Sequence, residues 1–128
     1  MEMEDCEALR ERVMQMVAEY EPRDDVSIFT NNEQSRHSDR YFLESGDKIR
    51  LFFEEEAFDS EGDLVQSKQQ SINKIGHALH DLDPLFERFS RKPALSGIVE
   101  DLGFTNPLLL QSMFIFKQPR IGGEVCFH

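Results

Sequence analysis

A histidine at the end of an apolar segment is the residue whose type and position most suggest chemistry. Residues 107–116 predict a strand, and residues 122–128 predict a Gly-Gly turn followed by the opening of a second strand. Because side chains alternate along a strand, Cys126 and His128 would share one face. A non-haem iron site commonly begins with a histidine on a strand beside such a turn, and it also needs a nearby carboxylate and a distant histidine. His128 is therefore a candidate iron ligand, and the alternative is an ordinary terminal histidine.

Three other groups could bind ions, and each has an ordinary alternative. His77 and His80 lie three residues apart on a predicted helix and could chelate a metal from one face. Otherwise one is buried with its hydrogen bonds satisfied and the other is solvated. Lys74 on the same helix could bind an anion, or could extend into water over apolar surface. Residues 54–56 are three consecutive glutamates, which do not converge on a cation, so a solvated strand edge is favoured.

The first half of the chain predicts a helix and a hairpin. Apolar residues recur at three- and four-residue spacing over residues 5–20, which indicates an amphipathic helix. Residues 22–40 are polar, with a short strand expected at most over residues 26–29. Residues 41–45 and 49–53 are β-prone runs around a Gly-containing turn, which is a hairpin signature.

The second half predicts helices followed by a strand. Residues 71–82 show helical spacing, and a short helix begins at Pro84. Residues 93–102 predict a third helix that buries Leu95, Ile98, Val99 and Leu102. Residues 107–116 are nearly continuously apolar, which is typical of a strand covered on both faces. The order favours an α+β fold in which a helical layer packs on an incomplete sheet.

Composition narrows the classes of function. The 128 residues fit one domain, and the net charge of −11 disfavours binding to nucleic acid or to anionic membranes. No apolar run approaches the roughly 20 residues of a transmembrane helix. Two cysteines make no disulfide framework and the N-terminus has no signal-peptide pattern, so we expect a cytoplasmic protein.

Three segments resemble the phytanoyl-CoA dioxygenase family. They are YFLESGDKIR at residues 41–50, SINKIGHALH at residues 71–80, and QSMFIFKQP at residues 111–119, which continues to GGEV at residues 122–125. The resemblance implies a double-stranded β-helix (jelly-roll) fold with flanking helices, of which this chain would be the N-terminal portion. It also implies iron(II) as cofactor and 2-oxoglutarate as co-substrate.

The same resemblance assigns roles to three residues. Lys74 would contact 2-oxoglutarate, Met113 would line the same pocket, and His128 would be the first iron ligand. The family continues from Glu-Val to a Pro-His-x-Asp pattern, whereas residues 126–128 are Cys-Phe-His. The carboxylate ligand, the second histidine and an arginine for the far carboxylate of 2-oxoglutarate have no counterpart in residues 1–128, and a family-typical first strand is absent.

Two functions follow as expectations. The first is an incomplete and inactive form of an iron(II)/2-oxoglutarate dioxygenase, whose small-molecule substrate the sequence does not identify. The second is a non-catalytic binding or regulatory variant that self-associates through unpaired apolar strands.

Overall fold

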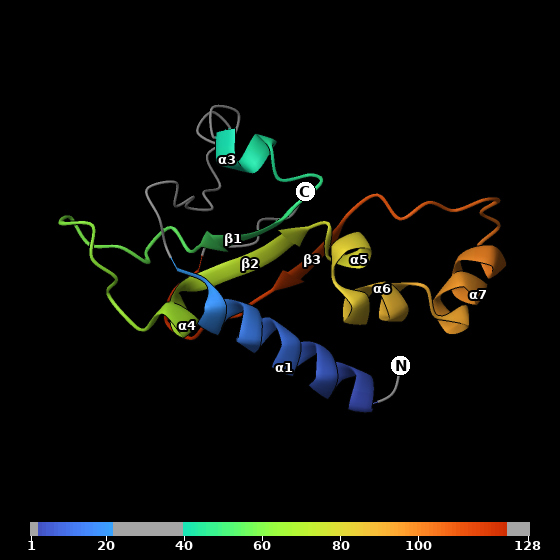
Figure 1. Ribbon diagram of the computed structural model, residues 1–128, viewed down its shortest axis with the longest axis horizontal. Helices are drawn as coiled ribbons and strands as arrows, with labels where there is room; N and C mark the ends of the chain where they lie inside the picture. Colours follow the sequence, from blue (N-terminus) through green and yellow to red (C-terminus); the bar gives the residue numbers. More distant parts are fainter. Residues whose placement is uncertain (1–2, 22–39, 123–128) are drawn as a thin grey trace.

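The computed structural model of the chain describes residues 3–21 and 40–122 as a small sheet with helices around it (Figure 1). The elements in chain order are α1 (Met3–Glu19), α3 (Arg40–Leu43), β1 (Ile49–Phe53), α4 (Lys68–Ser71), β2 (Ile72–His77), α5 (Leu79–Leu82), α6 (Pro84–Ser90), α7 (Pro93–Asp101) and β3 (Ser112–Ile115). The expected mixture of helices and strands is thus confirmed. No described helix is long and apolar enough to cross a membrane.

The sheet is antiparallel, with the strand order β1-β2-β3. In β2, Lys74 is opposite Phe52 while Ile72 is opposite Phe53, so Asn73 is one extra residue in the ladder. Such a bulge changes which face the following side chains occupy. Ile72 and Ile75 consequently both point into the core, although they are three residues apart.

The core lies between the sheet and α1. Leu9, Val13 and Val17 recur every four residues on α1 and are buried against apolar residues of β1 and β2. The helix predicted over residues 5–20 is therefore confirmed. Both of its ends are held from elsewhere in the chain, because Lys92 binds Asp5 in its first turn and Lys68 donates to carbonyls at its last turn.

The prediction of a helix over residues 71–82 was wrong. Residues 72–77 form the central strand, Ser71 ends the short helix α4, and Leu79–Leu82 form α5. The bulge at Asn73 explains the error, since it gives a strand the three-residue apolar spacing of a helix. His77 and His80 therefore do not share a helix face.

The hairpin predicted for residues 41–53 was also wrong in its first half. Residues 40–43 are the helix α3, and β1 pairs with β2 instead. The rings of Tyr41 and Phe42 pack edge-on against Phe52, with centroids 5.4 and 5.9 Å away. The sequence of Tyr41 and Phe42 is typical of a strand, but their rings instead pack the helical turn α3 onto the sheet.

In the last third of the chain, the predicted helices are present but the predicted burial of their side chains is wrong. The helices beginning at Pro84 and Pro93 are confirmed, but no residue of α7 is fully buried, and Ile98 and Leu102 are exposed. The strand predicted over residues 107–116 shrinks to Ser112–Ile115, and its side chains alternate between half-buried and exposed. Residues 26–29, where a short strand was expected, lie outside the described residues.

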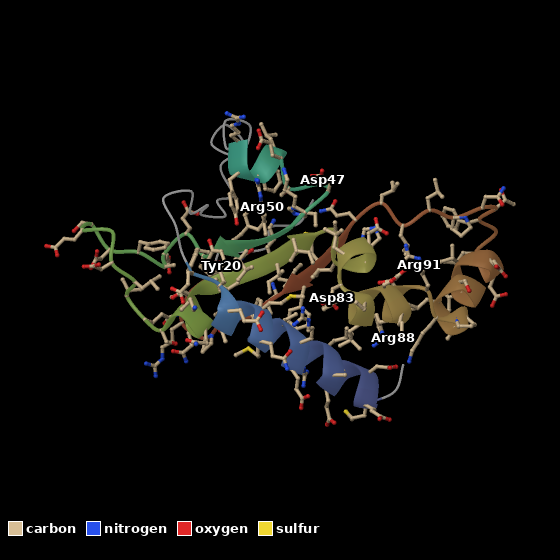
Figure 2. The ribbon with its side chains drawn as sticks, viewed as in Figure 1. Tyr20, Asp47, Arg50, Asp83, Arg88 and Arg91 are labelled. Atoms are coloured by element: carbon tan, nitrogen blue, oxygen red, sulfur yellow. The ribbon has the colours of Figure 1, made fainter. Side chains whose placement is uncertain are left out.

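Asp83 joins α1 to the start of α6, between which it lies in Figure 2. Its carboxylate accepts hydrogen bonds from the backbone amides of Leu85 and Phe86 at 3.0 and 3.2 Å, and from Arg12 Nε at 2.7 Å. The side chain is only 2% exposed. Burial raises the pKa of Asp83, but the hydrogen bonds from Arg12 and the two amides together hold its pKa below the ordinary value of 3.8.

We expect Asp83→Asn to destabilise the chain by about 1–2 kcal/mol through loss of the charged bond to Arg12, and Asp83→Ala by about 1 kcal/mol more, since alanine also removes the helix cap. Urea unfolding measures both values. Because a depressed pKa stabilises only while the carboxylate is charged, the Asn variant and the parent should converge as the pH falls below about 4. The control is Asp101→Asn, which removes an exposed carboxylate at the end of α7. Equal stability of parent and Asp83→Ala at pH 7 would refute this role.

Candidate functional site

Lys74 lies in the centre of the sheet, on the face opposite α1. The register places it opposite Phe52 on one side and Ile115 on the other. Only 6% of Lys74 is exposed, so the alternative of a solvated lysine on a helix was wrong. Alternation along the strands assigns one shared face to Arg50, Phe52, Lys74, Gly76, Met113 and Ile115.

Two aromatic rings cover the Lys74 ammonium group. Its Nζ lies 5.3 Å from the ring centroids of both Phe42 and Phe52, which is cation–π distance. Arg50 fixes α3 above them, because its guanidinium donates to the carbonyl of Tyr41 and lies 4.3 Å from the Tyr41 ring centroid. A cation in this largely dry setting attracts an anion more strongly than one in water.

His77 lies against the same two rings, with centroids 5.5 Å from Phe42 and 5.4 Å from Phe52. Its Nδ1 is 2.7 Å from the hydroxyl of Ser45, and that hydroxyl is 2.6 Å from the carbonyl oxygen of Phe42. A carbonyl only accepts, so the single hydrogen of Ser45 goes to Phe42. His77 must then donate from Nδ1 to Ser45.

Burial lowers the pKa of His77 below its ordinary value of 6.5, and the positive charge of Lys74 lowers it further. His77 is therefore neutral at pH 7, with its hydrogen on Nδ1 and a lone pair on Nε2. Sequence reasoning missed this pair, because it placed His77 on a helix and gave Ser45 no role. One feature of the sequence could have pointed to this pair, because Ser45 and His77 both lie in segments that carry the family resemblance.

Met113 lies on the same sheet face as Lys74, opposite Gly76. A side chain at Gly76 would place its Cβ 3.1 Å from Met113 Cγ, so the glycine leaves room for the methionine across β2. Met113 is 44% exposed and thus open to a ligand. The structure brings Lys74 and Met113 together on one surface, and their contact with 2-oxoglutarate stays a prediction.

His80 has a structural role. It is buried, and its backbone N–H donates to Ser112 Oγ at 2.9 Å while its Nδ1 lies 2.8 Å from the same oxygen. Its Nε2 faces the carbonyl of Leu109 at 3.2 Å, so this nitrogen carries the hydrogen. These bonds tie α5 to β3. One histidine was expected to be solvated, but both His77 and His80 are buried.

No group of three metal-ligating side chains occurs within residues 3–21 and 40–122. Glu54 is buried, and its carboxylate accepts a hydrogen bond from the side-chain amide of Asn73 at 2.9 Å. The prediction of an exposed acidic strand edge therefore holds only for Glu55 and Glu56. His128 and Cys126 lie outside the described residues. His128 as an iron ligand therefore stays a prediction.

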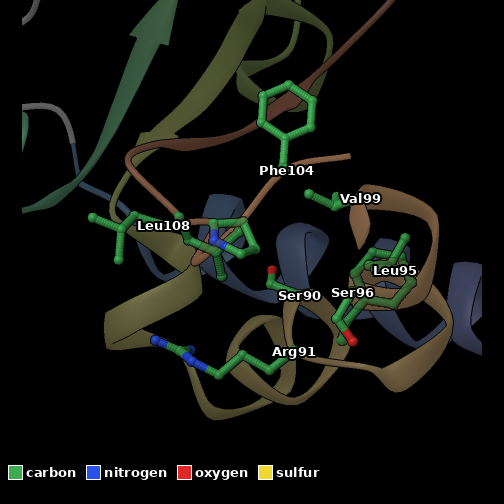
Figure 3. Close-up of a pocket in the computed structure, with 10 residues that line it drawn as sticks. Ser90, Arg91, Leu95, Ser96, Val99, Phe104 and Leu108 are labelled. Carbon is green, nitrogen blue, oxygen red and sulfur yellow. The ribbon is translucent and has the colours of Figure 1, made fainter. Parts of the chain in front are cut away.

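An apolar hollow of about 830 Å³ lies apart from Lys74, between the helices α6 and α7 and the segment 104–109 (Figure 3). Leu95, Val99, Phe104 and Leu108 supply apolar walls. Arg91 lines it too, but its guanidinium already binds Asp81 and the carbonyl of His80. The lining therefore suits an apolar group rather than a carboxylate, because the Arg91 guanidinium is already paired. The sequence did not reveal it, because residues 107–110 were expected to be a covered strand.

Comparison with known proteins identifies the protein family. The family model described as phytanoyl-CoA dioxygenase (PhyH) matches residues 1–128, and the chain belongs to this family, as its three segments predicted. It is 53% identical over 102 residues to a protein of Arabidopsis thaliana named phytanoyl-CoA dioxygenase, covering 80% of this chain and 36% of the relative.

Two animal relatives match nearly the whole chain. Proteins named phytanoyl-CoA dioxygenase domain-containing protein 1 are 45% identical over 130 residues in Danio rerio and 42% identical over 134 residues in Mus musculus. Each match covers 98% of this chain and 45% of the relative. The chain thus spans less than half the length of the curated relatives it matches.

Replacing Lys74 by methionine should raise the pKa of His77, because it removes the nearby positive charge while leaving the imidazole buried. NMR titration of the imidazole measures this pKa. Lys117→Met, which removes an exposed lysine, is the matched control. If the pKa of His77 is the same in the parent and in Lys74→Met, the two groups are not electrostatically coupled and the described site is wrong.

Proposed function

We propose that the protein containing these residues is an iron(II)- and 2-oxoglutarate-dependent dioxygenase, and that Lys74 binds a carboxylate of 2-oxoglutarate. The observation that carries the proposal is the buried ammonium group of Lys74 under two phenylalanine rings, on a sheet face that also carries Met113, in a member of a dioxygenase family. The identity of the oxidised substrate is left open.

The residues fit the anionic co-substrate in a specific way. An ammonium group on a rigid central strand supplies a fixed positive charge, and its aromatic cover limits competition from water. Met113 offers an apolar wall beside the charge, which suits the methylene groups of a short dicarboxylate. Bound iron would supply the activation of dioxygen. Within residues 1–128, the family resemblance suggests His128 as a ligand for that iron.

We further propose that β1, β2 and β3 belong to the sheet of a double-stranded β-helix, with α1 packed on its outer face, in a single domain over residues 1–128. Support comes from the antiparallel order and from the membership in the family. We also propose a cytoplasmic location, which the low cysteine content supports. The net charge of −11 supports a small-molecule ligand over a nucleic acid.

Substitution of Lys74 tests the proposal. We expect Lys74→Met to weaken 2-oxoglutarate binding about 10- to 100-fold, the value of one charge-assisted hydrogen bond. Lys74→Arg should retain part of the affinity, since it keeps the charge, and Lys117→Met should match the parent. Isothermal titration calorimetry gives the dissociation constants. Equal affinities for the parent and Lys74→Met would remove Lys74 from the site.

Release of succinate is the second readout for the same preparations. The family resemblance suggests one of three iron ligands within these residues, so a polypeptide limited to residues 1–128 should give only background succinate with iron(II), ascorbate and 2-oxoglutarate. Turnover clearly above that background would show that the polypeptide completes an iron site.

A second proposal is a binding function through self-association. Exposed apolar side chains cluster over α7 and the segment after it, at Ile98, Leu102, Phe104, Leu108 and Leu110. In the described part of the chain, β3 is an edge strand that pairs only with β2. Apolar patches and open strand edges favour pairing with another copy, while the net charge of −11 opposes it.

Self-association should therefore increase with salt, which screens the repulsion between acidic copies. Sedimentation velocity of the parent at low and high ionic strength measures the change. Leu108→Lys combined with Leu110→Lys should keep the chain monomeric, and Val65→Lys, an exposed apolar position elsewhere, should not. A parent that stays monomeric at both salt concentrations would exclude this function.

A further inference from the structure

The Nε2 atom of His77 is a buried hydrogen-bond acceptor. His77 is only 5% exposed, and its Nδ1 hydrogen is used by Ser45. Within residues 3–21 and 40–122, Nε2 has no hydrogen-bonding partner. A buried polar atom without a partner costs free energy, so such an atom in a native structure indicates a functional role or a bound water or ion.

Lys74 and His77 are held against the same aromatic pair. Each of the two groups lies between 5.3 and 5.5 Å from the ring centroids of Phe42 and Phe52. The charge of Lys74 also acts on His77. Because both groups pack on this ring pair and interact electrostatically, an anion bound at the ammonium group would also act on the imidazole. The lone pair on neutral Nε2 would repel a carboxylate oxygen, whereas a protonated Nε2 would donate to it.

We propose that His77 is a second contact of the anion site at Lys74, and that 2-oxoglutarate binds there together with one proton from solvent, held on Nε2 of His77. This inference rests on the proposed binding of 2-oxoglutarate at Lys74. In the bound state, an ammonium and an imidazolium face the two negative charges of the ligand. In the empty site the imidazole is neutral, so the chain avoids two buried cations side by side.

Other charged groups lie on the described elements that pack near His77. On β1 and the turn before it these groups are Arg50, Lys48 and Asp47; on α3 and its end they are Arg40 and Glu44; and β3 contributes the uncharged Ser112 opposite His77. Arg40 pairs with Glu44 at 2.6 Å, and Arg50 is committed to Tyr41. Lys74 is the group whose charge lowers the pKa of His77.

Linkage fixes the direction of the pH dependence. The free site has a His77 pKa below 6.5, and a bound dicarboxylate would raise it. Between these two pKa values, binding takes up to one proton, and affinity falls up to about tenfold for each pH unit as the pH rises. Below the lower value the imidazole is already charged, so the affinity stops changing.

Calorimetry in buffers of different ionisation enthalpy counts the proton directly. With the parent chain and 2-oxoglutarate at pH 7.5, we expect net proton uptake, of at most one proton per ligand bound. His77→Gln, which keeps a polar side chain but cannot take the proton, should bind without uptake and with an affinity independent of pH. Nitrogen NMR of the His77 imidazole in the parent needs no variant, and should show Nε2 becoming protonated as 2-oxoglutarate is added.

Each outcome separates this inference from the function on which it rests. Binding that depends on Lys74 but takes up no proton, with the His77 signals unchanged, would overturn the role of His77 and leave the 2-oxoglutarate site intact. An absence of 2-oxoglutarate binding in the parent would overturn both. Proton uptake that persists in His77→Gln would assign the proton to another group and also reject the inference.

Discussion

The pairing of β2 on both of its edges is the constraint on which the described site depends. Hydrogen bonds to β1 and β3 hold β2 in one register, so Lys74 has fixed neighbours in Phe52 and Ile115. Burial of Ile72 and Ile75 against α1 prevents a slip of the strand, since a shift by one residue would move the apolar side chains out of the core. The core on one face of β2 thus positions the chemistry on the other.

The elements that the sequence predicted correctly are those with local signals. The spacing of Leu9, Val13 and Val17 identified α1, and proline with a capping residue identified α6. The central strand could not be predicted this way, because the bulge at Asn73 gives it helical spacing. A bulge follows from pairing with residues about twenty positions away, which no local pattern contains.

The residues of the candidate site also divide into those that the sequence could predict and those that it could not. Lys74 and Met113 were singled out by family resemblance, and the structure places both on one sheet face. The partnership of His77 with Ser45 was not predictable, because it depends on a helical turn that brings the Phe42 carbonyl to the Ser45 hydroxyl. That bond decides which nitrogen of His77 carries the hydrogen. A contact with residues more than thirty positions away in sequence therefore sets the protonation of the strand's last residue.

Mapping of 2-oxoglutarate by NMR tests the central claim most directly. In a titration of the parent chain, we expect shifts of the amides of Lys74 and His77 and of the Met113 methyl group, all of which lie on β2 or on the strand paired with it. The amides of Leu95 and Leu108, at the apolar hollow, should not move. Shifts confined to the hollow, or a titration without change along β2, would contradict an anion site at Lys74.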